Sequence, residues 1–166
     1  MNHDTETLMF GATDRVQQAI LDREAPAIAV LQGDRLLVMS DYDYHRDRDT
    51  AATFERRAAA QAQEIHAVRF VFAVPQIWEP TKSGINAGPV SNTPLREGEQ
   101  EVIAWLAYDT TDGVDYGHVP YTRRRNGAPV FDDPEVFTNP VRPYDRYPGW
   151  LLLRLLLEAD DGLLGN

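Results

Sequence analysis

The sequence predicts an α+β fold in a single domain spanning residues 1–166, with a mainly antiparallel sheet of about five or six strands and two or three helices on one face. The first observation is size: 166 residues, of which 43% are hydrophobic, suit one domain with its own core. The second is that β-type segments follow one another across short turns, which favours hairpins. The third is that helix-type segments flank them.

The N-terminal part is expected to contain an arm and then a short helix. Residues 1–11 are interpreted as the arm. Thr13 can cap a helix that follows it, because apolar residues then recur at helical spacing. Pro26 is expected to end that helix near Glu24.

A hairpin and a second helix are expected next. Two apolar runs, at residues 27–31 and 35–40, flank the turn signal Gly33-Asp34. Residues 50–67 are predicted to form a helix, since apolar side chains repeat there every three or four positions.

Four further strands are predicted from runs of β-branched and aromatic residues. They cover residues 68–79, 101–109, 114–125 and 128–131. Asn126-Gly127 lies between the last two and is typical of a tight hairpin turn. Trp105, in the middle of the second run, is expected in the core.

Two long segments without regular structure and a final helix complete the prediction. Residues 80–98 are expected to be a long loop of the kind that often serves in binding or docking. Residues 132–149 are interpreted as a proline-rich linker to an apolar helix at 150–160. Residues 151–157 include six leucines, so this helix is either buried all round or docks on another surface.

Tryptophan and leucine residues beside these segments are predicted to form a protein interface, because tryptophan is enriched in interfaces. The predicted interface residues are Trp78, Trp150, Leu151, Leu152, Leu155 and Leu156.

Two resemblances follow from these patterns. The order of elements is similar to that of profilin-like and roadblock-like domains, which stack helices on a central antiparallel sheet. The segment Phe72–Glu79 (FAVPQIWE), followed by Pro94, Arg96 and Glu101-Val102-Ile103, resembles small uncharacterised bacterial and phage proteins. Neither resemblance implies an activity.

Charge and composition exclude several classes of function. The 26 acidic and 16 basic residues give a net charge of −10, which argues against general nucleic-acid binding, although Arg123-Arg124-Arg125 forms one basic cluster. The chain has no cysteine, so disulfides and cysteine-ligated metals are excluded. It has no run of 18 apolar residues and no signal-peptide pattern, so we expect no membrane association and a place in the cytoplasm or within a viral or phage particle.

A metal site is one hypothesis for the polar run at residues 41–49. Asp41, Asp43 and His45 alternate, so they share one face if the chain is extended. Carboxylate and imidazole groups arranged in this way could bind Mg²⁺, Ca²⁺ or Mn²⁺. The alternative is a solvated strand end before a helix.

An acid–base site is a second hypothesis, around the turn that carries Asp109, Asp112, Asp115 and His118. The alternative is ordinary turn chemistry, because Asp-Gly is a common turn pair. The sequence contains neither a serine nucleophile elbow nor a phosphate-binding glycine motif.

The sequence therefore favours a non-enzymatic protein-interaction domain or a structural subunit of a larger assembly, for example a phage or viral particle component. Its partner is then another protein or a second copy of the chain, and no cofactor is predicted. Two alternatives stay open: a small metal-dependent hydrolase that uses the Asp/His run, and an acidic inhibitor of a basic nucleic-acid-binding partner.

Overall fold

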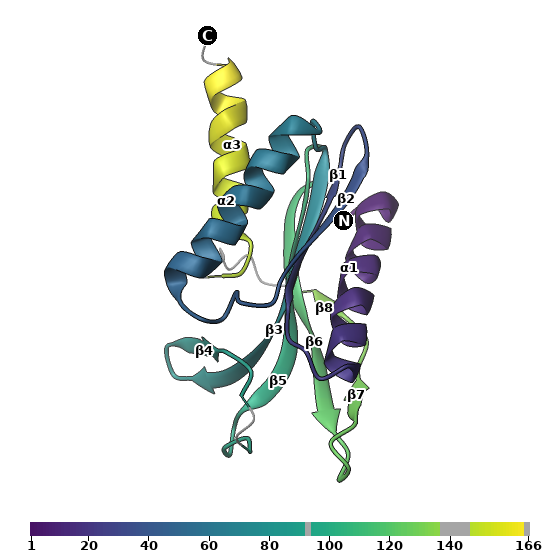
Figure 1. Ribbon diagram of the computed structural model, residues 1–166, viewed down its shortest axis with the longest axis vertical. Coiled ribbons are helices and arrows are strands. Elements are labelled where there is room, and N and C mark those ends of the chain that lie inside the picture. The colour runs from purple at the N-terminus through teal and green to yellow at the C-terminus, as the bar shows by residue number, and fades with distance from the viewer. Residues whose placement is uncertain (92–93, 137–146, 165–166) are drawn as a thin grey trace.

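The computed structural model describes residues 1–91, 94–136 and 147–164 as three helices packed on one curled antiparallel sheet (Figure 1). This confirms the predicted α+β class. The helices are α1 (His3–Leu21), α2 (Arg48–Glu64) and α3 (Trp150–Leu164). The strands are β1 (Ala27–Gln32), β2 (Leu36–Asp41), β3 (Arg69–Thr81), β4 (Gly84–Gly88), β5 (Gln100–Asp109), β6 (Gly113–Arg123), β7 (Pro129–Phe131) and β8 (Glu135–Val136).

The centre of the sheet is the antiparallel pair β3 and β5. The order of strands is β2-β1-β3-β5-β6-β7, with β4 paired to β3 and β8 paired to β6. The β3–β5 register runs from Arg69 opposite Asp109 to Trp78 opposite Gln100. Trp105 lies in the middle of β5 and is fully buried, as predicted.

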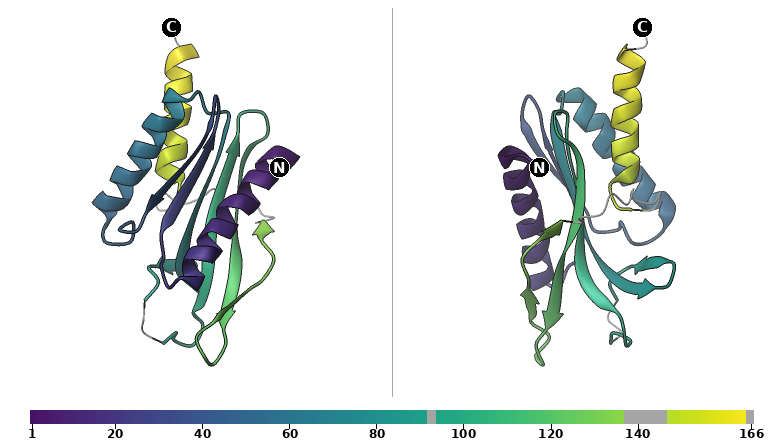
Figure 2. Two further views of the ribbon diagram at one scale, coloured as in Figure 1. Left: turned by 45° about the vertical axis from the view of Figure 1, so that its right-hand side comes forward. Right: turned by 180° about the vertical axis from the view of Figure 1, so that it is seen from behind.

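Helices cover both faces of the sheet, so the prediction that they share one face is wrong (Figure 2). Phe70 and Phe72 of β3 pack in one cluster with α2 and α3, whereas Val71 and Ala73 pack in another with α1. Successive side chains of a strand point to opposite faces. Because both sets are apolar, each face needs a cover, and a single layer of helices cannot provide both.

The predicted N-terminal arm is wrong, because α1 begins at His3. The side chain of Asn2 caps this helix by accepting a hydrogen bond from the Thr5 N–H at 2.9 Å. Thr13, the predicted cap, lies buried inside the helix and donates to the Met9 carbonyl at 3.1 Å. The buried face of α1 consists of Thr5, Leu8, Met9, Ala12, Thr13, Val16 and Ile20.

The predicted loop at 80–98 and linker at 132–149 both contain strands. The first two residues of the predicted loop belong to β3, and β4 then folds back on the end of β3 so that Thr81 lies opposite Gly84. In the linker, β8 pairs with β6, while residues 137–146 lie outside the described residues. Gly117 of β6 permits this pairing, because a Cβ there would lie 1.8 Å from the Glu135 carbonyl oxygen.

Most of the predicted interface residues belong to the core instead. Leu152 and Leu156 of α3 are buried against α2 and the sheet, and Trp78 is 6% exposed. Trp150 and Leu155 are partly buried against the same core, and Leu151 is half-buried. The physical reason is that α2 and the sheet form an apolar groove which the leucine-rich face of α3 fills.

A buried carboxylate fixes the start of α3. The Glu55 side chain, from α2, accepts hydrogen bonds from the Leu152 N–H at 3.2 Å and from the Tyr44 hydroxyl at 2.8 Å. The first N–H groups of a helix have no partner within the helix, so this carboxylate satisfies one of them and suits the positive end of the helix dipole. Burial raises the pKa of Glu55 above its usual value.

This contact predicts a difference between two substitutions of one residue. Glu55→Gln retains an oxygen for Leu152 and a polar group for Tyr44, so its free energy of unfolding should stay within about 1 kcal/mol of the wild type. Glu55→Ala leaves two buried groups unpaired and should lose about 2–4 kcal/mol. Urea denaturation followed by circular dichroism measures both.

The matched control is Glu64→Ala, an exposed position at the end of the same helix, which should change stability by less than about 0.5 kcal/mol. Equal stability of the alanine and glutamine variants at position 55 would show that the carboxylate does not anchor α3.

Candidate functional site

Helix α1 covers only part of the sheet face on which it packs. Helix α1 ends at Leu21, and β1, which begins at Ala27, pairs with β3 only as far as Ala73. Strands β3, β5 and β6 continue beyond this point. A cavity of about 830 Å³ lies at this uncovered end, between the end of α1, the segment after β4 and the β6–β7 hairpin. We call it the α1 groove.

The walls of the α1 groove combine apolar and polar side chains in similar measure. Three parts of the chain contribute its main side chains: Ile20, Leu21, Arg23 and Glu24 from the end of α1; Val90, Ser91, Pro94 and Leu95 from the segment after β4; and Tyr121, Arg123, Asn126 and Pro129 from the hairpin. Leu21 is 50% exposed and Leu95 is 44% exposed. An open groove with exposed leucines can gain free energy when a ligand covers them.

The floor of the groove carries a closed ion pair. Arg123 Nε lies 2.8 and 3.2 Å from the two carboxylate oxygens of Glu101, which is buried. Arg123 also donates to the Gly127 carbonyl at 3.0 Å, and its guanidinium lies over the Tyr121 ring. Burial, together with the Glu101 charge, raises the pKa of the Tyr121 hydroxyl far above neutrality. The floor therefore has no net charge at neutral pH.

A rigid turn forms the rim at the end of α1. The Glu24 N–H donates to the Ala19 carbonyl at 2.8 Å and the Arg23 N–H to the Ile20 carbonyl at 3.0 Å, which is the Schellman pattern. Arg23 has φ of 63°, a left-handed conformation that favours glycine. The arginine therefore holds the rim at a conformational cost.

We predict that Arg23→Gly raises the free energy of unfolding by about 1 kcal/mol, because glycine removes this cost. The control is Arg15→Gly, at an exposed position inside the same helix, which should lower it by about 1 kcal/mol. Thermal or urea denaturation distinguishes the two signs. If both variants lose stability, the left-handed turn is not the source of strain.

The structure does not assemble the predicted metal site. Asp41 ends β2, and residues 42–45 form a turn, so the extended geometry that was predicted for this run is wrong. Asp41 accepts from the Asp43 N–H at 2.9 Å, while His45 Nε2 donates to the Pro75 carbonyl at 2.7 Å. Burial lowers the pKa of His45. Within residues 1–91, 94–136 and 147–164, no three such ligands group in a way that could hold a metal ion.

The predicted acid–base residues do not bring His118 together with a carboxylate of Asp109, Asp112 or Asp115. Asp109 points to the α1 side of the sheet, because it follows the buried Ala107 of that cluster by two residues. His118 lies opposite Ala104 on the other face, with its ring 5.0 Å from Trp78 and its Nε2 3.4 Å from Glu135. Asp115 lies 3.5 Å from the N-terminal ammonium group. These residues form no common site.

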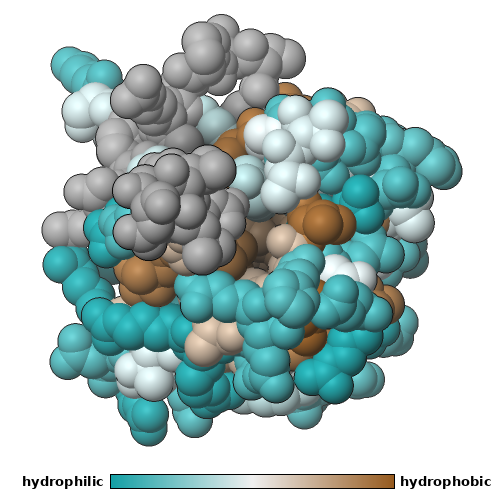
Figure 3. Space-filling view, turned by 90° about the horizontal axis from the view of Figure 1, so that it is seen from above, coloured by the Kyte–Doolittle hydropathy of each residue, from teal (hydrophilic) through white to brown (hydrophobic). Residues whose placement is uncertain are grey.

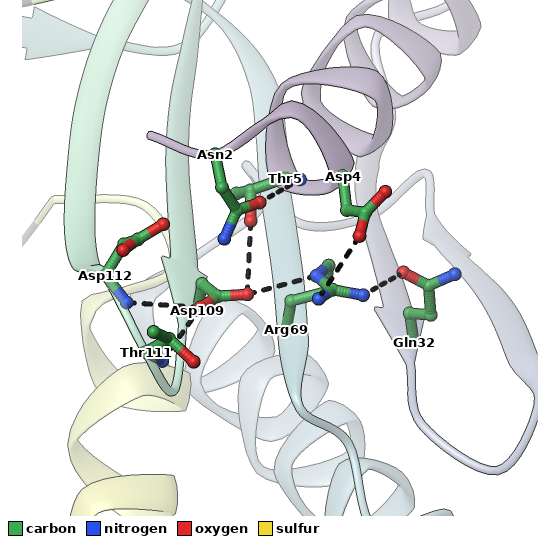
Figure 4. A network of polar contacts seen from close by, with 8 residues as sticks. All are labelled: Asn2, Asp4, Thr5, Gln32, Arg69, Asp109, Thr111 and Asp112. Carbon is green, nitrogen blue, oxygen red and sulfur yellow. Dashed lines mark hydrogen bonds and ion pairs between the residues drawn. The ribbon is translucent and has the colours of Figure 1, made fainter.

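Asp109 instead links α1 to the sheet, as Figure 4 shows. Its carboxylate accepts from the N–H groups of Thr111 and Asp112 at 2.8 and 3.1 Å, from the Thr5 hydroxyl at 3.3 Å and from Arg69 Nε at 3.1 Å. Each of these donors stabilises the ionised form.

The same contacts depress the pKa of Asp109. Burial opposes ionisation, but the hydrogen bonds from Thr111, Asn2, Asp112 and Arg69 outweigh it and hold the pKa at about 2. Arg69 is held in turn by the Gln32 side chain at 2.7 Å. We interpret this network as structural, since every strong donor around the carboxylate is already in use.

A pH-dependent loss of stability follows from this depressed pKa. The stabilisation by ionised Asp109 is fully present above the unfolded-state pKa near 4, and it is lost as the pH falls toward about 2. We predict that Asp109→Asn is less stable than wild type at pH 6 and that the difference shrinks steadily below pH 4. Urea denaturation at a series of pH values measures this.

The control for this prediction is Asp112→Asn, because the Asp112 side chain is exposed and only its N–H contacts Asp109. That variant should follow the wild-type pH profile. A constant difference between wild type and Asp109→Asn from pH 6 to pH 2 would show that this carboxyl does not titrate in the way described.

Comparisons of the chain with protein-family models, with curated proteins and with solved structures find no match. None of the helices in the described ranges combines the length and the apolar character that crossing a membrane requires. The function is therefore inferred from the groove and the surface of this chain alone.

Sequence reasoning did not identify the α1 groove, because its three walls come from distant parts of the chain. Leu21, Glu101 and Arg123 meet only after the sheet has formed. One signal was present: the predicted docking loop at 80–98 contributes Pro94 and Leu95 to the groove.

Proposed function

We propose that this chain is a non-enzymatic protein-interaction domain, a subunit of a larger assembly in the cytoplasm or within a phage or viral particle. In this proposal the α1 groove receives an extended, apolar segment of a partner protein. The observation that carries the proposal is the pair of exposed leucines, Leu21 and Leu95, on the walls above a floor whose charges are paired.

The chemistry of the groove favours an apolar segment over a charged small molecule. A charged ligand gains most from an unpaired opposite charge, but Glu101 and Arg123 already neutralise each other. An apolar side chain gains from contact with the leucine and proline walls. The exposed Arg23, Glu24 and Asn126 line the same groove, and protein interfaces commonly combine apolar and polar side chains in this way.

The volume of the α1 groove and the net charge of the chain indicate what kind of segment would bind there. At about 830 Å³, the groove lies in the upper part of the ~300–1,000 Å³ typical of ligand pockets, which leaves room for several side chains. The net charge of −10 repels acidic partners and attracts basic ones over a distance. We therefore expect a segment in which basic residues flank the apolar ones.

Selection from a library of random peptides displayed on phage tests the proposal and requires no candidate partner. We predict that the selected peptides carry one or more bulky apolar residues and bind in the α1 groove. Fluorescence titration should then show at least a tenfold loss of affinity for the double variant Leu21→Glu, Leu95→Glu, because each charge spoils an apolar contact worth about 1.5–3 kcal/mol.

The matched control is Leu157→Glu, an exposed leucine on α3 that does not line the groove. It should bind the peptides as tightly as wild type, and circular dichroism should show that all variants are folded. Binding that survives the double substitution, or a library that yields no binder, would contradict the proposal.

A further inference from the structure

The two edges of the sheet are built differently. At one edge, β7 has three residues and begins with Pro129, and β8 has two residues. Short strands and proline protect an edge from pairing with another chain. At the other edge lies β2, which has six residues and pairs only with β1 among the described strands (Figure 2).

Strand β2 carries little of what protects an edge, because its one charged residue, Asp41, is the last residue of the strand. Its segment Leu36–Ser40 (LLVMS) contains no charge, no proline and no glycine. Leu37 and Met39 pack partly against the α2 side, and Val38 packs partly against the α1 side, so the strand is apolar on both faces. An unprotected apolar edge presents unpaired N–H and C=O groups to any chain with a matching strand.

Apolar side chains are also exposed at the end of the sheet where β2 begins. Leu36, the first residue of β2, is 56% exposed, and Val68 is exposed close by, since its N–H donates to Gln32, the residue that pairs with Leu36. Figure 3 looks onto the end from which α3 projects and shows apolar patches among the polar side chains. A partner strand along β2 would cover Leu36 together with the backbone edge.

We propose that β2 pairs with β2 of a second copy of this chain, antiparallel and about a two-fold axis at Val38, so that the two sheets become one. The charges at the two ends of β2 are the reason for choosing a second copy of this chain as the partner. Arg35 precedes the strand and Asp41 ends it. In the register centred on Val38, each Arg35 lies opposite Asp41 of the other copy, so two pairs of opposite charges frame the interface.

The side chains between these ends also match in this register. Leu37 lies opposite Met39, and Leu36 lies opposite Ser40, so no apolar residue faces a charge. An antiparallel pair of this kind satisfies the free backbone groups of both edges at once, and a two-fold axis uses the same patch on both copies. The interface does not include the α1 groove, so this proposal stands independently of the function proposed above.

Light scattering and a single introduced cysteine test the pairing on the full chain. The wild type should have a mass near 37 kDa, twice 18.7 kDa. Because the chain has no cysteine, Val38→Cys gives one thiol per copy, and two such residues across the axis lie about 4.5–5.5 Å apart between Cα atoms, within disulfide range. We expect oxidation to link Val38→Cys into dimers at least tenfold faster than Val130→Cys.

Val130 is the matched control because it is exposed in the middle of β7, at the protected edge. Val38→Lys should lower the mass to 18.7 kDa while circular dichroism stays unchanged, and Val130→Lys should leave the dimer intact. A wild-type mass of 18.7 kDa at high protein concentration would overturn the proposal. So would a dimer that Val38→Cys does not link faster than Val130→Cys.

Discussion

The antiparallel pairing of β3 with β5 is the constraint on which the rest of the structure depends. These two strands pair over ten positions, and their side chains are apolar on both faces. Two apolar faces require two covers, which is why α1 lies on one side and α2 with α3 on the other (Figure 2). The pair is also longer than α1, and the α1 groove occupies the uncovered end.

The buried carboxylates of the molecule serve this architecture. Glu55 satisfies the first turn of α3, Asp109 ties the first turn of α1 to the β5–β6 turn, and Glu101 pairs with Arg123 under the groove. Each has its oxygens occupied by donors from other parts of the chain. A carboxylate held in this way stabilises the packing of the elements that it joins.

The sequence predicted the strands well because alternation and turn chemistry are local. The hairpin at Asn126-Gly127 and the buried Trp105 follow from short stretches of residues, and both are confirmed. The start of α1 was missed because the polar residues around Asn2 are also typical of an arm. The sequence left open whether Leu152 is buried or docks on another surface, and it did not bring Leu21 together with Leu95, since both outcomes depend on residues far apart in the chain.

Photo-crosslinking in the cells that naturally produce the protein tests the central claim most directly. A photoreactive amino acid placed at Leu95 lies on the wall of the α1 groove, whereas the same amino acid at Leu157 lies on α3, outside the groove. The account predicts that position 95 becomes covalently linked to another protein and that position 157 does not. Absence of any adduct at position 95, or equal adducts at both positions, would contradict it.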